Sequence, residues 1–229
     1  MKFILSRTDD YTIHSKKWII GYGLLFWLVS RIVAMCLVVG CIAIYNSVGI
    51  DPETATRFSG DPETAATLGS WLYILLTVSL VAPVLEECIF RLGLSFRRVH
   101  VALAAASVPA YFLWQSLGFL TVVSAIIYVG IIAAVFSLIY FLTTDSFWQK
   151  QKARHLRSAI WITAIGFGLI HLIAFSDYSL ALLPYMLCVV TVPLFAGFAI
   201  TYYRINLGFG WGVGMHIFNN IPAMVVMLL

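Results

Sequence analysis

Apolar residues occur along this chain in long blocks, interrupted by short polar segments. Blocks of about 18 or more mainly apolar residues recur, and a helix of that length crosses a hydrocarbon core about 30 Å thick. The pattern predicts an all-α transmembrane helical bundle of about seven spans. The predicted spans are 18–45, 68–92, 101–116, 119–142, 158–175, 180–203 and 208–229.

Composition supports the same fold class. Of the 229 residues, 62% are hydrophobic and only 10% are charged, which leaves too little polar surface to cover a soluble globule of this size. No linker or shift in composition divides the sequence, so we predict one integral membrane domain over 1–229. Within it, the first span and an outer loop occupy 18–67, and core helices occupy 68–229.

The basic residues outside the spans fall on one predicted side of the membrane. The positive-inside rule places basic loops in the cytoplasm, so we expect a cytoplasmic amino terminus and no nucleic-acid partner for the net charge of +4. A short chain without organelle-targeting signals favours a bacterial plasma membrane. The basic residues on the predicted inner side are Lys2, Arg7, Lys16, Lys17, Arg97, Arg98, Lys150, Lys152, Arg154, Arg157 and Arg204.

The predicted outer loop, 46–67, contains an internal repeat. The five residues Asp-Pro-Glu-Thr-Ala occur at 51–55 and again at 61–65. Asp caps helices and Pro suits their first turn, so we interpret the repeats as two helix starts. The spacing of oxygen ligands is too sparse to favour a calcium site. The role of this loop stays open.

Four acidic or histidine side chains lie inside predicted spans: Glu86, Glu87, His171 and His216. A charged group at the centre of a membrane helix costs roughly 2.5 to 3.5 kcal/mol on insertion scales, so such groups usually serve a function. Glu86, His171 and His216 lie 11, 14 and 12 residues from the nearest basic loop residue. At 1.5 Å per residue, three separate helices bring polar groups to one depth, about 16 to 21 Å from those residues.

Helix geometry assigns different partners to the two adjacent glutamates. Glu87 and Arg91 are four residues apart on one helix face, which predicts a buried ion pair. Glu86 points about 100° away, which leaves it to act as a general base. Arg31 lies at a similar depth and is a candidate to neutralise Glu87 or to hold a substrate carboxyl group. Of these two, we favour the structural role.

The histidines also have neighbours at helical spacing. His216 and Asn220 share a face and offer two hydrogen-bond donors, as an oxyanion site requires. Phe167 and His171 share another face, where Phe167 is expected to wall the pocket and keep it dry. The alternating glycines at positions 208–214 lack the Lys-Ser or Lys-Thr of a phosphate loop, and we expect them to permit close helix approach.

Three motifs now stand in order: EExxxR at 86–91, FxxxH at 167–171 and HxxxN at 216–220. This ordered set resembles the CAAX protease and bacteriocin-processing family, also called CPBP or Abi, over roughly residues 80–222. The resemblance implies a glutamate-dependent intramembrane endopeptidase that needs no cofactor or metal. Its substrate would be a prenylated carboxyl-terminal peptide or, in bacteria, a bacteriocin or pheromone precursor embedded in the bilayer.

The resemblance also implies residue roles. The residues matching Glu86 and His171 would activate water, and those matching His216 and Asn220 would hold the oxyanion. Glu87 and Arg91 would support the site structurally.

Other functions use similar groups. A non-proteolytic membrane partner, such as a bacteriocin-immunity or regulatory protein, would only bind through the polar cluster. A proton-coupled transporter also uses glutamate and histidine at the midplane, although no convincing inverted repeat is present. Two histidines and a glutamate also match a zinc ligand set, but the sequence has no HExxH motif. The oligomeric state stays open.

Overall fold

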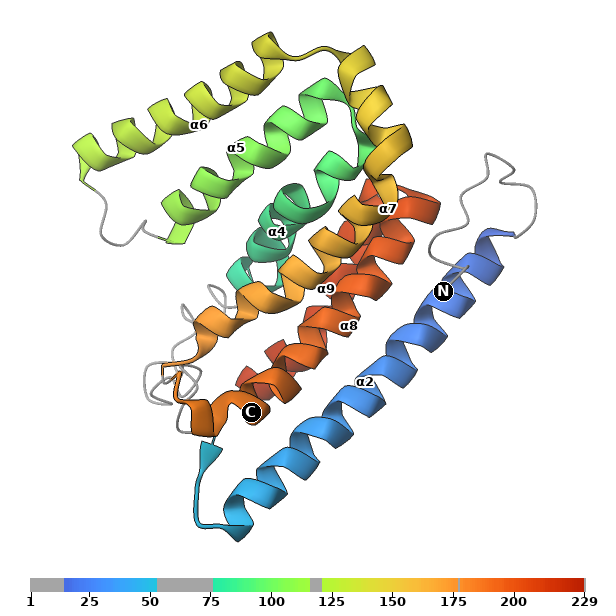
Figure 1. Ribbon diagram of the computed structural model, residues 1–229, viewed down its shortest axis with the longest axis vertical. Coiled ribbons are helices and arrows are strands. Elements are labelled where there is room, and N and C mark those ends of the chain that lie inside the picture. Colours follow the sequence, from blue (N-terminus) through green and yellow to red (C-terminus); the bar gives the residue numbers. More distant parts are fainter. Residues whose placement is uncertain (1–14, 53–75, 116–120, 177, 229) are drawn as a thin grey trace. The chain divides into compact units, whose positions relative to one another are not determined.

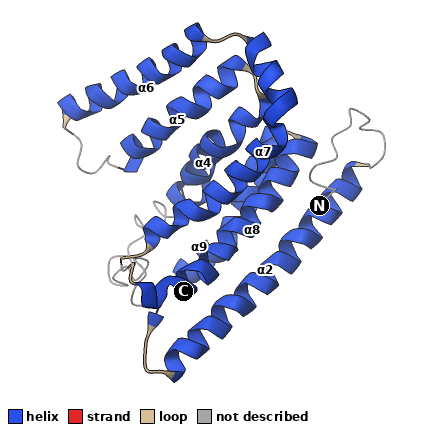
Figure 2. Ribbon diagram, viewed as in Figure 1, coloured by secondary structure: helices blue, strands red, loops and turns tan. Residues whose placement is uncertain are grey.

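The computed structural model describes residues 15–52, 76–115, 121–176 and 178–228. Within these ranges every regular element is a helix, as predicted (Figure 1 and Figure 2). Internal contacts divide the chain into two compact units. Unit 1 consists of Met1–Leu75 and Ala164–Leu229, and unit 2 consists of Leu76–Thr163. The single domain over 1–229 stays a prediction.

Four of the described helical segments are long and apolar enough to cross a membrane. They correspond to the first, fourth, fifth and sixth predicted spans, and they identify the chain as a helical membrane protein. The segments are Lys16–Ser47, Val122–Leu142, Asp145–Ala174 and Leu180–Leu207.

The other three predicted spans are not confirmed as membrane-crossing. The third and seventh are helices, α5 (Arg98–Gln115) and α9 (Phe209–Leu228), but neither is among the four. Much of the second predicted span, and most of the repeat-containing loop, lies outside the described residues.

Unit 1 is built around α8 (Leu183–Leu207). The helix α2 (Lys16–Ser47) packs against α8, and α9 packs against α8 as well (Figure 1). The hydroxyl of Tyr203 on α8 donates to the carbonyl oxygen of Ile20 on α2 at 2.8 Å. Tyr203 also belongs to a buried cluster with Ile200 and Met215. Partly buried residues of α2 pack against this cluster, which therefore joins α2, α8 and α9.

The end of α7 (Asp145–Ile170) completes unit 1. At Gly168 an added Cβ would lie 2.9 Å from Cβ of Leu194 on α8, so only glycine allows the two backbones to approach this closely. A second buried cluster, including Phe175 and Tyr185, follows beyond the end of α7. These contacts hold the 167–171 segment against α8.

Unit 2 begins with a π-helical turn (Thr77–Val81), α4 (Ala82–Arg91) and a 3₁₀ turn (Leu92–Ser95). Both α4 and α6 (Val122–Leu142) pack against α5. The apolar side chains of α6 remain largely exposed, and the helix contains no fully buried residue. This is the surface expected of a helix surrounded by lipid.

The fifth predicted span starts earlier than expected. The basic residues between positions 150 and 157, predicted to lie in a loop, are part of α7, which begins at Asp145. The backbone N–H of Phe147 donates to the Thr144 hydroxyl, which caps this start. Gln, Lys, Ala and Arg are good helix formers, and hydropathy alone does not detect such a polar extension. These basic residues therefore lie on a helix and not in a loop.

Candidate active site

Two histidines of unit 1 meet on one aromatic ring. The Phe167 ring centroid lies 5.1 Å from that of His171 and 5.2 Å from that of His216. Phe167 is 1% exposed and His216 is 2% exposed. The i,i+4 spacing on α7 accounts for the first contact, whereas the second joins α7 to α9. Both imidazoles thus contact the buried ring of Phe167.

Local structure fixes the orientation of His171. The α-helix ends at Ile170, and a 3₁₀ turn follows at His171–Ala174. Nδ1 of His171 lies 2.8 Å from the carbonyl oxygen of Phe167. A carbonyl can only accept, so this hydrogen bond requires the proton on Nδ1 and leaves the lone pair on Nε2. The neutral ring then presents a basic nitrogen on its other side.

The two adjacent asparagines of α9 have different hydrogen-bond partners, which the sequence did not predict. Asn219 is buried, and its Oδ1 accepts from Nε1 of Trp27 at 2.9 Å and from the guanidinium of Arg31, both on α2. Its Nδ2 donates to Oδ1 of Asn220 at 3.2 Å. The half-buried Asn220 therefore sits beside an amide held by the first helix.

Arg31 itself has a neutral environment. Its guanidinium donates to Asn219 and lies 5.9 Å from the Trp27 ring centroid. Among the residues that the structure describes, the hydrogen bonds and ion pairs of Arg31 include no carboxylate. Glu87, which the sequence predicted as a candidate partner of Arg31, pairs with Arg91 in unit 2.

That pair is the predicted one. Nη1 of Arg91 donates to Oε1 of Glu87 at 2.7 Å on α4, and both side chains are 0% exposed. Glu86 is only partly buried, so it is the more accessible of the two carboxylates to water. Arg91 also interacts electrostatically with Glu86, so one guanidinium interacts with both adjacent acids.

Two glycines of the run before His216 differ from expectation. An added Cβ at Gly210 or Gly214 would meet no atom within 4 Å, so these two glycines face open space and do not mediate close packing. Gly208 has a φ of 105° and ends α8, a conformation that favours glycine.

The predicted site residues thus fall into two groups, each described within its own unit. Unit 1 brings together Phe167, His171 and His216, and links Asn220 to α2 through Asn219. Unit 2 brings together Glu86, Glu87 and Arg91. No group of three or more His, Cys, Asp or Glu side chains within the described ranges is arranged to hold a metal ion.

Comparison with known proteins adds no family assignment. The chain matches no family model, no curated protein and no solved structure.

Proposed function

We propose that this protein is an intramembrane endopeptidase of the CPBP type, which hydrolyses a peptide bond of a membrane-embedded peptide or protein. Glu86 and His171 activate the attacking water, and His216 and Asn220 hold the oxyanion. Glu87, Arg91 and Phe167 support them. The observation that carries the proposal is the pair of imidazoles, from two helices far apart in the sequence, that pack on Phe167.

The environment of the imidazoles supports acid–base and oxyanion chemistry. His171 has its Nδ1 proton engaged by the Phe167 carbonyl, so Nε2 is the nitrogen that can accept a hydrogen bond from water. Phe167 excludes water from one side of both rings. Hydrogen bonds in such a dry surrounding are stronger than in bulk water.

Glu86 is proposed as the general base. Its carboxylate is the more accessible one at the EExxxR motif, while Glu87 is occupied by Arg91. Glu86 and His171 belong to different units, and their proposed action on one water rests on the sequence: the order of the motifs and the equal depth of the three polar positions. In the reaction, Glu86 takes a proton from water as the oxygen attacks the carbonyl carbon, and that proton then passes to the leaving amine.

The oxyanion donors are proposed on α9. His216 and Asn220 lie four residues apart on this helix. Because Oδ1 of Asn220 accepts from Asn219, the amide has a defined orientation in which its NH₂ end is the donor. Each oxyanion donor typically contributes about 3 to 4 kcal/mol to transition-state stabilisation.

The finer assignments are part of the same proposal. Seven spans with a cytoplasmic amino terminus are proposed from the hydropathy blocks and the positive-inside rule. A bacterial plasma membrane is proposed from the short chain without organelle-targeting signals. A prenylated carboxyl-terminal peptide, or a bacteriocin or pheromone precursor, follows from the family resemblance alone.

The test is cleavage of candidate membrane peptides by purified protein in detergent or lipid vesicles, read by mass spectrometry. Glu86→Gln should abolish cleavage while helix content and thermal stability stay at the wild-type level. Asn220→Ala should lower kcat by roughly 10² to 10³ with little change in KM, the pattern of a group acting in the transition state. Asn206→Ala on α8, whose amide donates to the Tyr202 carbonyl oxygen of the same helix, is the matched control and should cleave normally.

Three outcomes would overturn the proposal. Full cleavage by Glu86→Gln would remove the general base. Absence of cleavage by wild type across precursor and prenylated peptides, combined with specific binding of one of them, would favour a non-proteolytic partner. Activity lost to a chelator and restored by zinc would replace the glutamate-base mechanism with a metal one.

A further inference from the structure

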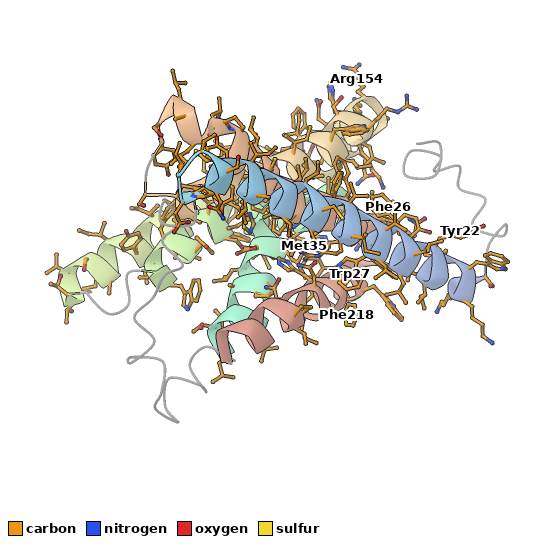
Figure 3. All side chains as sticks on the ribbon, turned by 90° about the horizontal axis from the view of Figure 1, so that it is seen from below. Tyr22, Phe26, Trp27, Met35, Arg154 and Phe218 are labelled. Carbon is orange, nitrogen blue, oxygen red and sulfur yellow. The ribbon has the colours of Figure 1, made fainter. Side chains whose placement is uncertain are left out.

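A groove runs along unit 1 between α2 and α9. It has a volume of about 410 Å³. Its walls include Ile20 and Leu24 of α2 and Gly210, Gly214 and Phe218 of α9, and Tyr203 of α8 also lines it. At one end of the groove Trp27 of α2 meets Phe218, with ring centroids 5.0 Å apart, as the neighbouring labels in Figure 3 show.

The side chains that line the groove favour a hydrocarbon occupant. The Tyr203 hydroxyl already donates to the carbonyl oxygen of Ile20 at 2.8 Å. The other lining side chains are apolar, and the two glycines face open space where a Cβ would touch nothing within 4 Å. Leu24 is 40% exposed and Phe218 is 42% exposed, so the groove opens at the surface of this membrane protein.

Charge at one end of the groove selects the kind of lipid. Lys16 and Lys17 lie four and three residues before Ile20, so they continue its face of α2 toward the membrane surface. Both lysines are exposed. Beside them, the rings of Trp18 and Tyr22 stack at 5.2 Å, an arrangement typical of the headgroup level.

We propose that this groove is a binding site for an anionic phospholipid, whose acyl chain lies between α2 and α9 and whose phosphate meets Lys16 and Lys17. The site belongs to unit 1 alone and does not depend on peptidase activity. A bound lipid there fills the space that Gly210 and Gly214 leave open and covers the α2–α9 seam.

The experiment is native mass spectrometry of the detergent-purified protein, titrated with phosphatidylglycerol or phosphatidylcholine. Wild type should retain one phosphatidylglycerol per chain in preference to phosphatidylcholine. Gly214→Leu places a side chain in the groove and should weaken retention about tenfold or more. Gly130→Leu is the matched control, because Gly130 also faces open space but lies on α6 in unit 2, away from the residues that line this groove. It should bind like wild type.

A second pair of substitutions tests the headgroup. Lys16→Gln with Lys17→Gln should reduce the preference for phosphatidylglycerol, by on the order of fivefold per lysine, and leave phosphatidylcholine retention unchanged. If Gly214→Leu fails to fold, Leu24→Trp fills the groove from α2 and should give the same loss.

The proposal is overturned if groove-filling variants retain lipid like Gly130→Leu, or if wild type shows no preference between the two lipids. It is also overturned if the same spectra show a dimer that Gly214→Leu dissociates, since a second copy would then occupy the groove. All of these results are independent of whether the protein cleaves peptides.

Discussion

Two arginines in predicted spans of this protein are compensated in different ways. Arg91 on α4 is 0% exposed and pairs with the equally buried carboxylate of Glu87. Arg31 on α2 is only partly buried and bonds to the neutral amide of Asn219 beside the Trp27 ring. The first arrangement cancels a full charge within one helix. The second, among the described residues, pairs the charge with no carboxylate and connects two helices.

The difference indicates separate roles. A fully buried ion pair contributes to stability, because removing either member leaves the other charge buried without a partner. A cation held by a neutral amide can lose its partner at a modest cost, and the amide keeps its second donor, Trp27 Nε1. We therefore expect the Arg91 region to control stability, and the Arg31 region to control the alignment of α2 with α9.

The largest expected effect is at α4. Glu87→Gln leaves the Arg91 charge without its carboxylate partner and should lower the free energy of unfolding by about 3 to 5 kcal/mol. Denaturant or thermal unfolding in micelles measures this. Replacing both members by leucine should restore much of the loss, because burying two apolar side chains avoids the desolvation of an ion pair. Wild-type stability for Glu87→Gln alone would contradict a structural role for the pair.

A smaller effect is expected when the Arg31 region is made to resemble the Arg91 region. Arg31→Leu alone should cost only about 1 kcal/mol of unfolding free energy, the net value of one hydrogen bond. In an Asn219→Asp background the same substitution should cost about 2 kcal/mol, below the value for a fully buried pair because Arg31 is partly exposed. Equal costs in both backgrounds would show that the nature of the partner does not matter here.

The smallest effect concerns the two donors to Asn219. Trp27→Phe and Arg31→Leu each leave one donor on Oδ1 of Asn219, whereas the double variant leaves none. A double-mutant cycle in unfolding free energy should therefore show a coupling of about 1 kcal/mol. Strict additivity would indicate that the two hydrogen bonds act independently. Cleavage measured on the same variants would report whether the alignment of α9 affects turnover.

The sequence predicted interactions within one helix better than interactions between helices. The Glu87–Arg91 and Phe167–His171 contacts follow from the four-residue spacing and are present. The bond from Trp27 to Asn219 joins residues 192 positions apart, and no periodicity within either helix indicates it. The only available signal was the spacing of Trp27 and Arg31 on one face of α2.

The sequence did not predict the role of Asn219, because the spacing from His216 selects Asn220 and says nothing about the neighbouring face, where Asn219 meets α2. The late start predicted for α7 came from hydropathy, which detects lipid-facing residues but not a polar helical extension. The prediction of seven spans likewise came from the length and hydropathy of apolar blocks. Among the described helices, four meet that criterion.

The bond between Trp27 and Asn219 also has a consequence for biogenesis. Asn219 is synthesised 192 residues after Trp27, which takes on the order of 10 to 40 s at usual rates of translation. During that interval α2 has left the ribosome without the helix that will accept its two hydrogen bonds. The insertion machinery, or the phospholipids around it, must shelter the Arg31 charge until the last helix arrives.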